Sequence, residues 1–544
     1  MRLLLIQPPI EDFYDTQIRL QPLGLAYLKA AVKKHVRDVQ VRIIDFHKGF
    51  GKHTIPIPDE LKYLGEYYEH ADQSPFCVFH QYYRFGADDH TITKHVSEYR
   101  PDIVGISCLF TPYYREALKT AAAVKRGCDC PVIVGGSHVS AAPDSVLLHP
   151  AVDYVICGEG EGPLVLFLQS WFYATSFDPA LIPGLGYKKQ GKQILNARDH
   201  SANTHDHLIP DLSDFTPDQY QYQGKPMAFV MTSRGCPYHC SFCSVHATFQ
   251  KFRQRSVENI IAEIRQRHQE GYRVIDFEDD NLTVDKNRCT ALLTALTEEF
   301  GEWGMQYLAM NGLSYRDLDL DILVAMKKAG FTHLNIALVS ANEAVLKSVS
   351  RPHRIGQYIE VVKEAHRLGL KILSSQILGF PSESLESIID SLVMAARLPV
   401  LIGASPLYVI PGTPLAQEIN LPPTPRNMVR ARLTAMGHET ESLKRTDIFT
   451  LFIATRMIDF VKSLPDLAGA SSINQLIAHR DSAIFSEREK IGLSLLLQWI
   501  NTGVLYASTS KGLKVIKQFD KGLLKKIWDS LDHVVTCSGG QVLI

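Results

Sequence analysis

Three closely spaced cysteines are the residues of this chain best suited to inorganic chemistry. Cys236, Cys240 and Cys243 follow a C-x3-C-x2-C spacing, so one loop can present three thiolates to one centre. A closed zinc or iron–sulfur site uses four protein ligands, and the next cysteine, Cys289, is far along the chain. A three-cysteine site leaves one metal position open, as catalysis requires. A structural zinc loop would lack its fourth ligand, and chance placement does not explain the frame Gly235-Cys236-Pro237-Tyr238.

The cysteine stretch resembles the radical S-adenosylmethionine (SAM) superfamily, in which an aromatic residue precedes the last cysteine. Phe242 stands at that position here. The resemblance implies that the three thiolates hold a 4Fe–4S cluster, whose free iron binds the amino and carboxylate groups of SAM. It further implies that the reduced cluster cleaves SAM to a 5′-deoxyadenosyl radical, so an electron donor such as flavodoxin or ferredoxin is an expected partner.

Repeats of strand, loop and helix begin at Ala228 and must position the cysteine loop. Strands are predicted over residues 229–232, 274–277, 306–310, 332–338, 371–378 and 401–409, and a helix over 257–269. This alternation predicts a partial (β/α)6 barrel over residues 223–420. The chemistry of such a barrel lies at the carboxyl ends of its strands.

The resemblance assigns SAM contacts to loops that follow these strands. Asp279 or Asp280 is expected to accept hydrogen bonds from the SAM amino group, with a solvated acidic helix cap as the plain alternative. Gly379 lies in a segment that resembles the glycine-bearing segment near the adenine. Relatives often read G-x-E-S-G after the fourth strand, whereas Val339 replaces the carboxylate here. Ser340 is still expected near the ribose.

Strands and helices also alternate ahead of the cysteine loop. Strands are predicted over residues 3–7, 39–45, 103–107, 132–135 and 154–157, and helices over 23–34, 114–125 and 162–171. Short Val, Ile and Leu runs alternating with helices predict an α/β fold with a doubly wound, Rossmann-like parallel sheet. Ligands of such sheets sit at the carboxyl ends of strands. These residues alone indicate only a ligand of nucleotide size.

Three phrases in order, V-G-I-S, V-G-G-S-H and V-D-Y-V-I-C-G-E-G-E, resemble the cobalamin-binding domain that precedes many radical SAM cores. The resemblance implies cobalamin as a second cofactor, bound by residues 1–180. An inert sheet that has lost its ligand is the structural alternative. The residues expected to contact cobalamin lie in the loops after the strands: Gln7, Pro8, Ser107, Leu109, Phe110, Gly135, Gly136, Gly158 and Glu159.

One histidine departs from a pattern found in some cobalamin domains. Asp45-Phe46-His47 begins the motif D-x-H-x-x-G, whose histidine replaces the lower ligand of cobalt, but Phe50 stands where the glycine is needed. The motif also follows the second predicted strand rather than the first. We therefore expect His47 to be a surface or loop histidine, and Leu109, Phe110 or Tyr113 to lie below the cobalt.

The remaining segments are less informative. Residues 50–100 form an aromatic-rich insertion, expected as a packed cap or, alternatively, as a lid over cofactor or substrate. Residues 181–222 are rich in turn signals and predict a connector. Residues 421–544 predict a helical C-terminal region, with helices over 451–464, 486–502 and 523–531, that closes the barrel and shapes the substrate pocket.

Composition limits the class of protein. The 544 residues are 45% hydrophobic and 21% charged, with a formal net charge of -1, so no global field favours nucleic acid. The sequence contains no uninterrupted run of 18 apolar residues, so no membrane span is predicted. The ten cysteines show no disulfide framework outside the trio, which favours a reduced, cytoplasmic setting. A small molecule, lipid or peptide is therefore the expected substrate class.

Together these features predict a cobalamin-dependent radical SAM enzyme that functionalises an unactivated C–H bond, most often in this family by methyl transfer from methylcobalamin. A cyclase or rearrangement enzyme with the same cofactors, and a cofactor-binding sensor without catalysis, remain open. Methylthiolation of RNA is disfavoured, because that family carries a second three-cysteine cluster in its N-terminal domain. The N-terminal cysteines that do not fit such a cluster are Cys77, Cys108, Cys128, Cys130 and Cys157.

Overall fold

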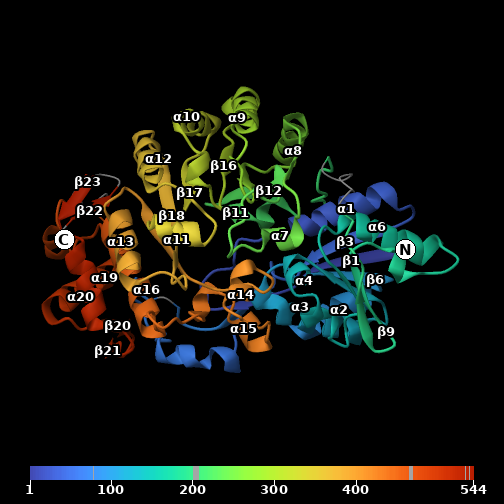
Figure 1. The fold of residues 1–544 in the computed structure, drawn as a ribbon, viewed down its shortest axis with the longest axis horizontal. Coiled ribbons are helices and arrows are strands. Elements are labelled where there is room, and N and C mark those ends of the chain that lie inside the picture. The colour runs from blue at the N-terminus through green and yellow to red at the C-terminus, as the bar shows by residue number, and fades with distance from the viewer. Residues whose placement is uncertain (78, 200–206, 465–469, 533, 538–539, 544) are drawn as a thin grey trace.

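A seven-stranded sheet and an open barrel of six parallel strands lie side by side, and a helical C-terminal region packs against both (Figure 1). The computed structural model describes residues 1–77, 79–199, 207–464, 470–532, 534–537 and 540–543. Within these ranges, no helix combines the length and apolar character needed to cross a bilayer.

The N-terminal sheet confirms the predicted α/β fold. Its strand order is β10-β9-β8-β7-β6-β1-β3, and the five strands from β8 to β3 are parallel. Helices α1 and α6 pack together, as do α2 and α3, which gives the doubly wound arrangement. The elements are β1 (Arg2–Gln7), α1 (Leu23–His35), β3 (Gln40–Asp45), α2 (Asp89–Tyr99), β6 (Ile103–Ser107), α3 (Tyr114–Gly127), β7 (Val132–Gly135), α4 (Ser137–Ala141), α5 (Asp144–Leu147), β8 (Tyr154–Ile156) and α6 (Glu161–Tyr173).

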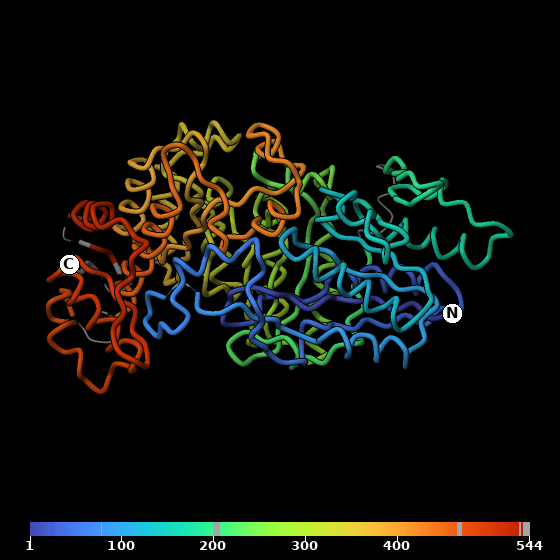
Figure 2. The backbone as a smooth tube through the Cα atoms, turned by 90° about the horizontal axis from the view of Figure 1, so that it is seen from below, coloured from blue at the N-terminus to red at the C-terminus, as the bar shows by residue number. Residues whose placement is uncertain are grey.

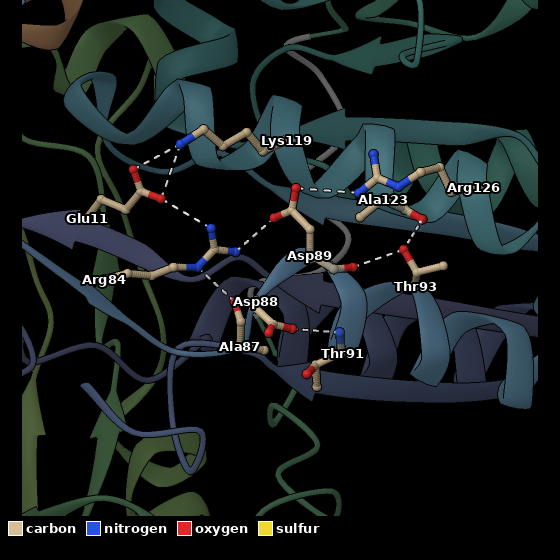
Figure 3. Close-up of polar contacts among 10 residues, drawn as sticks. All are labelled: Glu11, Arg84, Ala87, Asp88, Asp89, Thr91, Thr93, Lys119, Ala123 and Arg126. Carbon is tan, nitrogen blue, oxygen red and sulfur yellow. Dashed lines mark hydrogen bonds and ion pairs between the residues drawn. The ribbon is translucent and has the colours of Figure 1, made fainter. Parts of the chain in front are cut away.

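Helix α2 was not expected inside the aromatic insertion. It buries only Ile92 and Val96, so its apolar signal in the sequence is weak. Capping compensates: the Asp88 carboxylate accepts a 2.7 Å hydrogen bond from the backbone N–H of Thr91. Figure 3 shows Arg84 lying between Glu11 and Asp89, the first residue of the helix. Arg84 forms one ion pair with each of these two carboxylates. Polar contacts therefore supplement the small apolar face of this helix.

Residues 185–195 differ from the predicted connector. They form β9 (Leu185–Lys189) and β10 (Lys192–Leu195), an antiparallel hairpin that extends the N-terminal sheet beyond β8. Gln190 and Gly191 make its two-residue turn with φ of 51° and 74°, values that suit the twist of a hairpin. The sheet therefore reaches past residue 180.

The barrel has the predicted alternation of strands and helices. Isolated bridges, Tyr307 to Phe331 and Leu313 to Ile336, join the β12-β15-β16 sheet to the β17-β18-β19 sheet. Its strands are β12 (Lys225–Val230), β15 (Val274–Phe277), β16 (Gln306–Leu308), β17 (His333–Val339), β18 (Lys371–Leu378) and β19 (Leu401–Pro406). Its helices are α8 (Val257–Gln269), α9 (Lys286–Phe300), α10 (Leu320–Ala329), α11 (Glu343–Ser348), α12 (Ile355–Arg367) and α13 (Leu385–Ala396).

Other regions cover the two outer strands of the open barrel. The backbone N–H of Phe229 in β12 donates to the Gln21 side-chain oxygen at 2.8 Å. The N–H of Ile402 in β19 donates to the Asp459 carboxylate at 2.9 Å. The N-terminal loop and the C-terminal region thus satisfy backbone groups that an open barrel would expose.

The C-terminal region is helical, as predicted, and carries two hairpins in addition. The aromatic insertion lies beside it in both views (Figures 1 and 2). The hydroxyls of Tyr63 and Tyr68 donate to the carbonyls of Ala435 and Thr434. The elements are α14 (Pro414–Glu418), α15 (Pro425–Val429), α16 (Arg445–Ser463), α18 (Ile473–Ala478), α19 (Glu487–Thr502), β20 (Tyr506–Thr509), β21 (Gly512–Val515), α20 (Lys521–Ser530), β22 (Val534–Cys537) and β23 (Gly540–Leu543).

Candidate functional site

The cysteine loop follows β12 and lies at the carboxyl end of the barrel. Gly235 begins it with φ of 79°, and a Cβ there would lie 2.9 Å from the Lys251 carbonyl, so only glycine fits. Further along, the backbone of Ser241 bonds to Val349 and to Leu415. The Tyr238 hydroxyl donates to Asp317 at 2.5 Å. Two parts of the barrel and helix α14 therefore fix the loop that carries the cysteines.

Two thiols of this loop, those of Cys236 and Cys243, favour their neutral form. Burial raises the pKa of Cys236, and it raises the pKa of Cys243 to about 11, with the Asp280 carboxylate and the other cysteines as further causes. Within the described ranges, no three His, Cys, Asp or Glu side chains gather closely enough to hold a single metal ion. A 4Fe–4S cluster does not need such convergence, because each cysteine binds a different iron atom.

The two aspartates predicted to meet SAM occupy different environments. Asp279 is 2% exposed, and its carboxylate accepts hydrogen bonds from the backbone and hydroxyl of Thr232 and from the hydroxyl of Ser233. It therefore ties β15 to the base of the cysteine loop. Asp280 is exposed and close enough to influence the pKa values of Cys236 and Cys243. Asp280 is the one of the pair whose carboxylate a ligand can reach.

Arg351 is a site residue that the sequence reasoning missed. It is 8% exposed, and its guanidinium donates to the Cys240 sulfur at 3.8 Å and to the Ala337 carbonyl at 3.2 Å. Its Nε has no hydrogen-bond partner, and no carboxylate of the described residues forms an ion pair with it. A buried charge is costly without a counter-charge. The site therefore suits an anionic group beside the cysteines.

The end of β17, where the sequence departs from the family pattern, has an unusual backbone conformation. Val339 has φ of 71°, an unusual value for a β-branched residue. Ser340, expected near the ribose, is 1% exposed and donates to the Glu383 carboxylate at 2.7 Å. Burial raises the pKa of Glu383 to about 7. A buried internal contact thus occupies the Ser340 hydroxyl.

Phe242 and the segment after β18 lie together. The Phe242 ring is 5.4 Å from the ring of Phe380, within a small apolar cluster that is separate from the main core. Gly379 has φ of 96°, and a Cβ there would lie 2.6 Å from the Leu443 side chain. The glycine therefore serves a close contact with the C-terminal region, whether or not a ligand also approaches it.

The residues predicted to contact cobalamin gather at one edge of the N-terminal sheet. They end or follow β1, β6, β7 and β8, which are neighbours in the sheet order. Leu109 and Phe110 are 36% and 42% exposed, so two large apolar side chains remain open there. Gln7 and Pro8 are buried, and Ser107 is half-buried. The edge has the apolar surface that a corrin ring would cover.

Several of these positions have structural partners. Gly136 has φ of 127°, and a Cβ there would lie 2.5 Å from the Cys108 carbonyl, whereas Gly135 has ordinary clearance. The N–H of Gly158 donates to Ser140 at 2.8 Å. Glu159 pairs with both Arg234 and Arg253 at 2.6 Å. Packing accounts for Gly136 and ion pairs account for Glu159 without a ligand, and a hydrogen bond to Ser140 engages the N–H of Gly158.

His47 corrects one expectation. We expected a surface or loop histidine; it lies in the loop after β3 but is 0% exposed. Burial lowers the pKa of His47 to about 4, so the imidazole is neutral. Its backbone N–H donates to Asp45, whose carboxylate also accepts from the Tyr220 hydroxyl. His47 is thus part of a buried contact between the end of β3 and Tyr220, in the segment that precedes the barrel, and not of a surface site.

The cysteine loop packs against the edge of the N-terminal sheet where the residues predicted to contact cobalamin lie, which we call the cobalamin edge. Helix α7 (Val245–Thr248), directly after the last cysteine, contacts α4, directly after the Gly135-Gly136 turn. The Arg198 guanidinium bridges them, donating to the Ala247 carbonyl at 2.5 Å and to the Ser140 carbonyl at 2.9 Å. The two predicted cofactor sites therefore share one interface between sheet and barrel.

Comparison with known proteins identifies both regions. A model of the radical SAM superfamily matches residues 230–395, and a model of the B12 binding domain matches residues 78–168. The first match runs from the end of β12 to α13, and the second covers the strands β6, β7 and β8. The two matches lie on the two sides of the interface described above.

Relatives extend over most of the chain. An uncharacterized methyltransferase of Pyrococcus horikoshii is 29% identical over 409 residues, which cover 74% of this chain and 79% of that protein. A cytidylyl-2-hydroxyethylphosphonate methyltransferase of Streptomyces wedmorensis is 27% identical over 418 residues, or 70% of this chain and 73% of that protein.

A solved structure shares the fold. It is the radical SAM methyltransferase TsrM of Kitasatospora setae with cobalamin and a 4Fe–4S cluster bound. The two chains superpose with a TM-score of 0.58 at 16% identity, over 77% of this chain and 74% of that one. Because a single chain joins a B12 binding domain to a radical SAM domain, this protein belongs to the cobalamin-dependent radical SAM enzymes, whose cofactors are a 4Fe–4S cluster, SAM and cobalamin.

Proposed function

We propose that the protein methylates an unactivated carbon of its substrate by cobalamin-dependent radical SAM chemistry. The observation that carries this proposal is the interface between α7 and α4, which brings the cysteine loop against the carboxyl edge of the N-terminal sheet. Methyl transfer requires the two cofactors to face the same substrate. The relatives from Pyrococcus horikoshii and Streptomyces wedmorensis, both named as methyltransferases, support this outcome.

The chain's own residues divide the work of binding. Cys236, Cys240 and Cys243 would hold the cluster, which with SAM supplies the radical that abstracts hydrogen. Asp280 accepts hydrogen bonds from the SAM ammonium, since its carboxylate is exposed beside the cysteines. Arg351 pairs with the SAM carboxylate, because a buried guanidinium without an acidic partner suits that group. These charges orient SAM rather than transfer protons.

The N-terminal edge would receive cobalamin, the carrier of the methyl group. Leu109 and Phe110 offer apolar contact to the lower face of the corrin, and Gly135 leaves space for it beside β7. The substrate is then a small molecule, lipid or peptide that enters between barrel and sheet. A low-potential donor such as flavodoxin or ferredoxin supplies electrons, which fits a reduced cytoplasmic setting.

Anaerobic reconstitution tests the proposal. The full chain is loaded with cluster and cobalamin, supplied with SAM and a reductant, and assayed for 5′-deoxyadenosine and S-adenosylhomocysteine together. We expect both products from the parent. Cys240→Ala should lose cluster absorbance and SAM cleavage, whereas Cys128→Ala, a half-buried cysteine outside the trio, should retain both. A cluster-free variant that still cleaves SAM would contradict the assignment of these thiols.

The same assay separates the alternatives. A substrate that gains the mass of one methylene supports methylation, and a product without that gain indicates cyclisation or rearrangement. Bound cofactors with no 5′-deoxyadenosine under any reductant would indicate a sensor rather than an enzyme.

A further inference from the structure

One arginine of the N-terminal domain reaches into the radical SAM barrel. Arg19 lies in the loop between β2 (Ile10–Asp12) and α1, and its Nη1 contacts Asp276 at 2.5 Å and also Glu278. Its Nη2 donates to the Asn311 side chain at 3.3 Å, and its guanidinium lies 5.0 Å from the centre of the Phe229 ring. Three barrel strands and the loops after them therefore surround this one side chain.

The two carboxylates that Arg19 contacts face the inside of the barrel. Phe277 packs on Tyr307 and Phe331, so its side of β15 faces the outer core. Side chains alternate along a strand, which places Asp276 and Glu278 on the opposite, inner side. Pairing also continues one residue past β15, because the N–H of Glu278 donates to the Val230 carbonyl. The pairing of β15 with β12 thus extends to Glu278, the residue directly before Asp279 and Asp280.

The loop that carries Arg19 is attached at both sides of the interface. The Gln17 side chain donates to the His47 carbonyl of the N-terminal domain at 2.8 Å. The Gln21 side chain accepts from β12 of the barrel at 2.8 Å and is itself 2% exposed. Pro9 and β2 connect this loop to the Gln7-Pro8 segment at the cobalamin edge. A short, anchored stretch of chain therefore connects the two cofactor sites.

Charge makes this connection matter for the strand end. Asp276 and Glu278 are acidic neighbours on one face, and Asp280 follows them two residues later. Burial raises the pKa of Asp276 to about 7 and also raises that of Glu278, so the guanidinium is what favours their ionised form. Without Arg19, the strand end would lose the cation that neutralises and orients it.

We propose that Arg19 is a positioning residue that couples the cobalamin edge to the SAM site, by holding the end of β15 in the conformation that presents Asp280. This rests on the proposed function, since it takes Asp280 as a SAM contact. Contact of cobalamin with the Gln7-Pro8 segment would act through β2 on the loop that carries Arg19, and through Arg19 on the end of β15. Thermodynamic linkage then requires each cofactor to increase the affinity of the protein for the other cofactor by the same factor.

Binding measurements on the full chain with its reconstituted cluster test the coupling. SAM affinity is measured with and without saturating hydroxocobalamin, and cobalamin affinity with and without SAM. We expect the parent to show a roughly five- to tenfold mutual enhancement. Arg19→Met should reduce this enhancement to about one and weaken SAM binding about tenfold at unchanged cluster content. Arg19→Lys, which restores a charge, should recover part of both effects.

A control arginine distinguishes coupling from stability. Arg265 forms an ion pair with Glu299 on the outside of the same barrel, and Arg265→Met should leave the enhancement intact. The proposal is overturned if Arg19→Met lowers the melting temperature yet keeps the parent's SAM affinity and enhancement, or if the parent shows no enhancement. A parent that binds neither SAM nor cobalamin contradicts the proposed function itself, so the two failures are distinguishable.

Discussion

Arg351 is the residue whose environment is hardest to explain without a ligand. It is buried, it lies against Cys240, and among the described residues no acidic side chain pairs with it. Leaving a buried charge without a partner costs several kcal/mol in proteins, roughly 3–5 when one member of a pair is removed. A chain that retains such a cation gains from an anion that arrives with its cofactors.

Replacing this arginine should therefore weaken SAM binding while leaving the cluster in place. We expect Arg351→Gln to lower SAM affinity by a factor of about 10 to 100, the loss of a charge-assisted bidentate contact, and Arg351→Lys to lower it less. Equilibrium binding of SAM to the reconstituted protein measures this, with iron content determined in parallel. Arg367→Gln, an exposed arginine on α12, serves as the matched control. Unchanged SAM affinity in Arg351→Gln would refute the role.

At this scale the sequence predicted residue types better than residue roles. The cysteine trio follows from spacing alone, because few other functions need three thiols in one loop. The choice between Asp279 and Asp280 does not, since it depends on Thr232 and Ser233 folding back onto Asp279. Arg351 has no signal in the sequence either, because its role depends on the absence of an acidic partner in space.

Ion pairs join the loop after β8 to the start of the cysteine loop. Arg234, directly before the cysteine loop's first glycine, pairs with Glu159 and with Glu161 at 2.6 Å, and it lies 4.8 Å from the Tyr27 ring. Glu161 begins α6, and both it and Arg234 are nearly buried. An ion pair of this kind fixes the orientation of the elements that it joins.

Breaking the ion pair between Glu161 and Arg234 should weaken the retention of the cluster rather than prevent its assembly. We expect Glu161→Gln to leave Arg234 partly uncompensated, lower the melting temperature and speed the loss of iron to a chelator several-fold, because the cysteine loop loses an anchor. Chelation kinetics and thermal denaturation measure the two effects. Glu487→Gln, 87% exposed at the start of α19, provides the control. Parent-like chelation in Glu161→Gln would mean that the other anchors suffice.

Elements with strong periodicity were predicted well, and those held by polar contacts were not. Helix α8 and the strands β15 and β18 have the predicted bounds, since buried apolar residues recur there at regular spacing. Helix α2 was missed because its apolar face is small, with only Ile92 and Val96 buried, and a cap and ion pairs supplement it. The β9–β10 hairpin was missed because its strands carry three lysines, although Gln190-Gly191 is a turn signal.

The whole molecule is joined through a buried ion pair between its first and last regions. Asp12, the last residue of β2, is 0% exposed and pairs with Arg432 at 3.1 Å. Arg432 also donates to the carbonyls of Glu11 and Pro112, and the Thr434 hydroxyl donates to Asp12. The residues after 420 therefore complete the N-terminal domain as well as the barrel, although neither family model extends to them.

This interlocking predicts that the two recognised domains do not form a minimal enzyme. A chain that ends at residue 420 would leave Asp12 buried without its cation and the Ile402 end of β19 without Asp459. We expect it to aggregate or to melt well below the parent, and to take up neither cluster nor cobalamin fully. In the complete chain, Arg432→Met alone should cost about 3–5 kcal/mol, and adding Asp12→Asn should recover part of it, since the two sites are coupled. Thermal denaturation with cofactor content measures each case, and a 1–420 fragment with parent-like cofactor binding would show that the C-terminal region is dispensable.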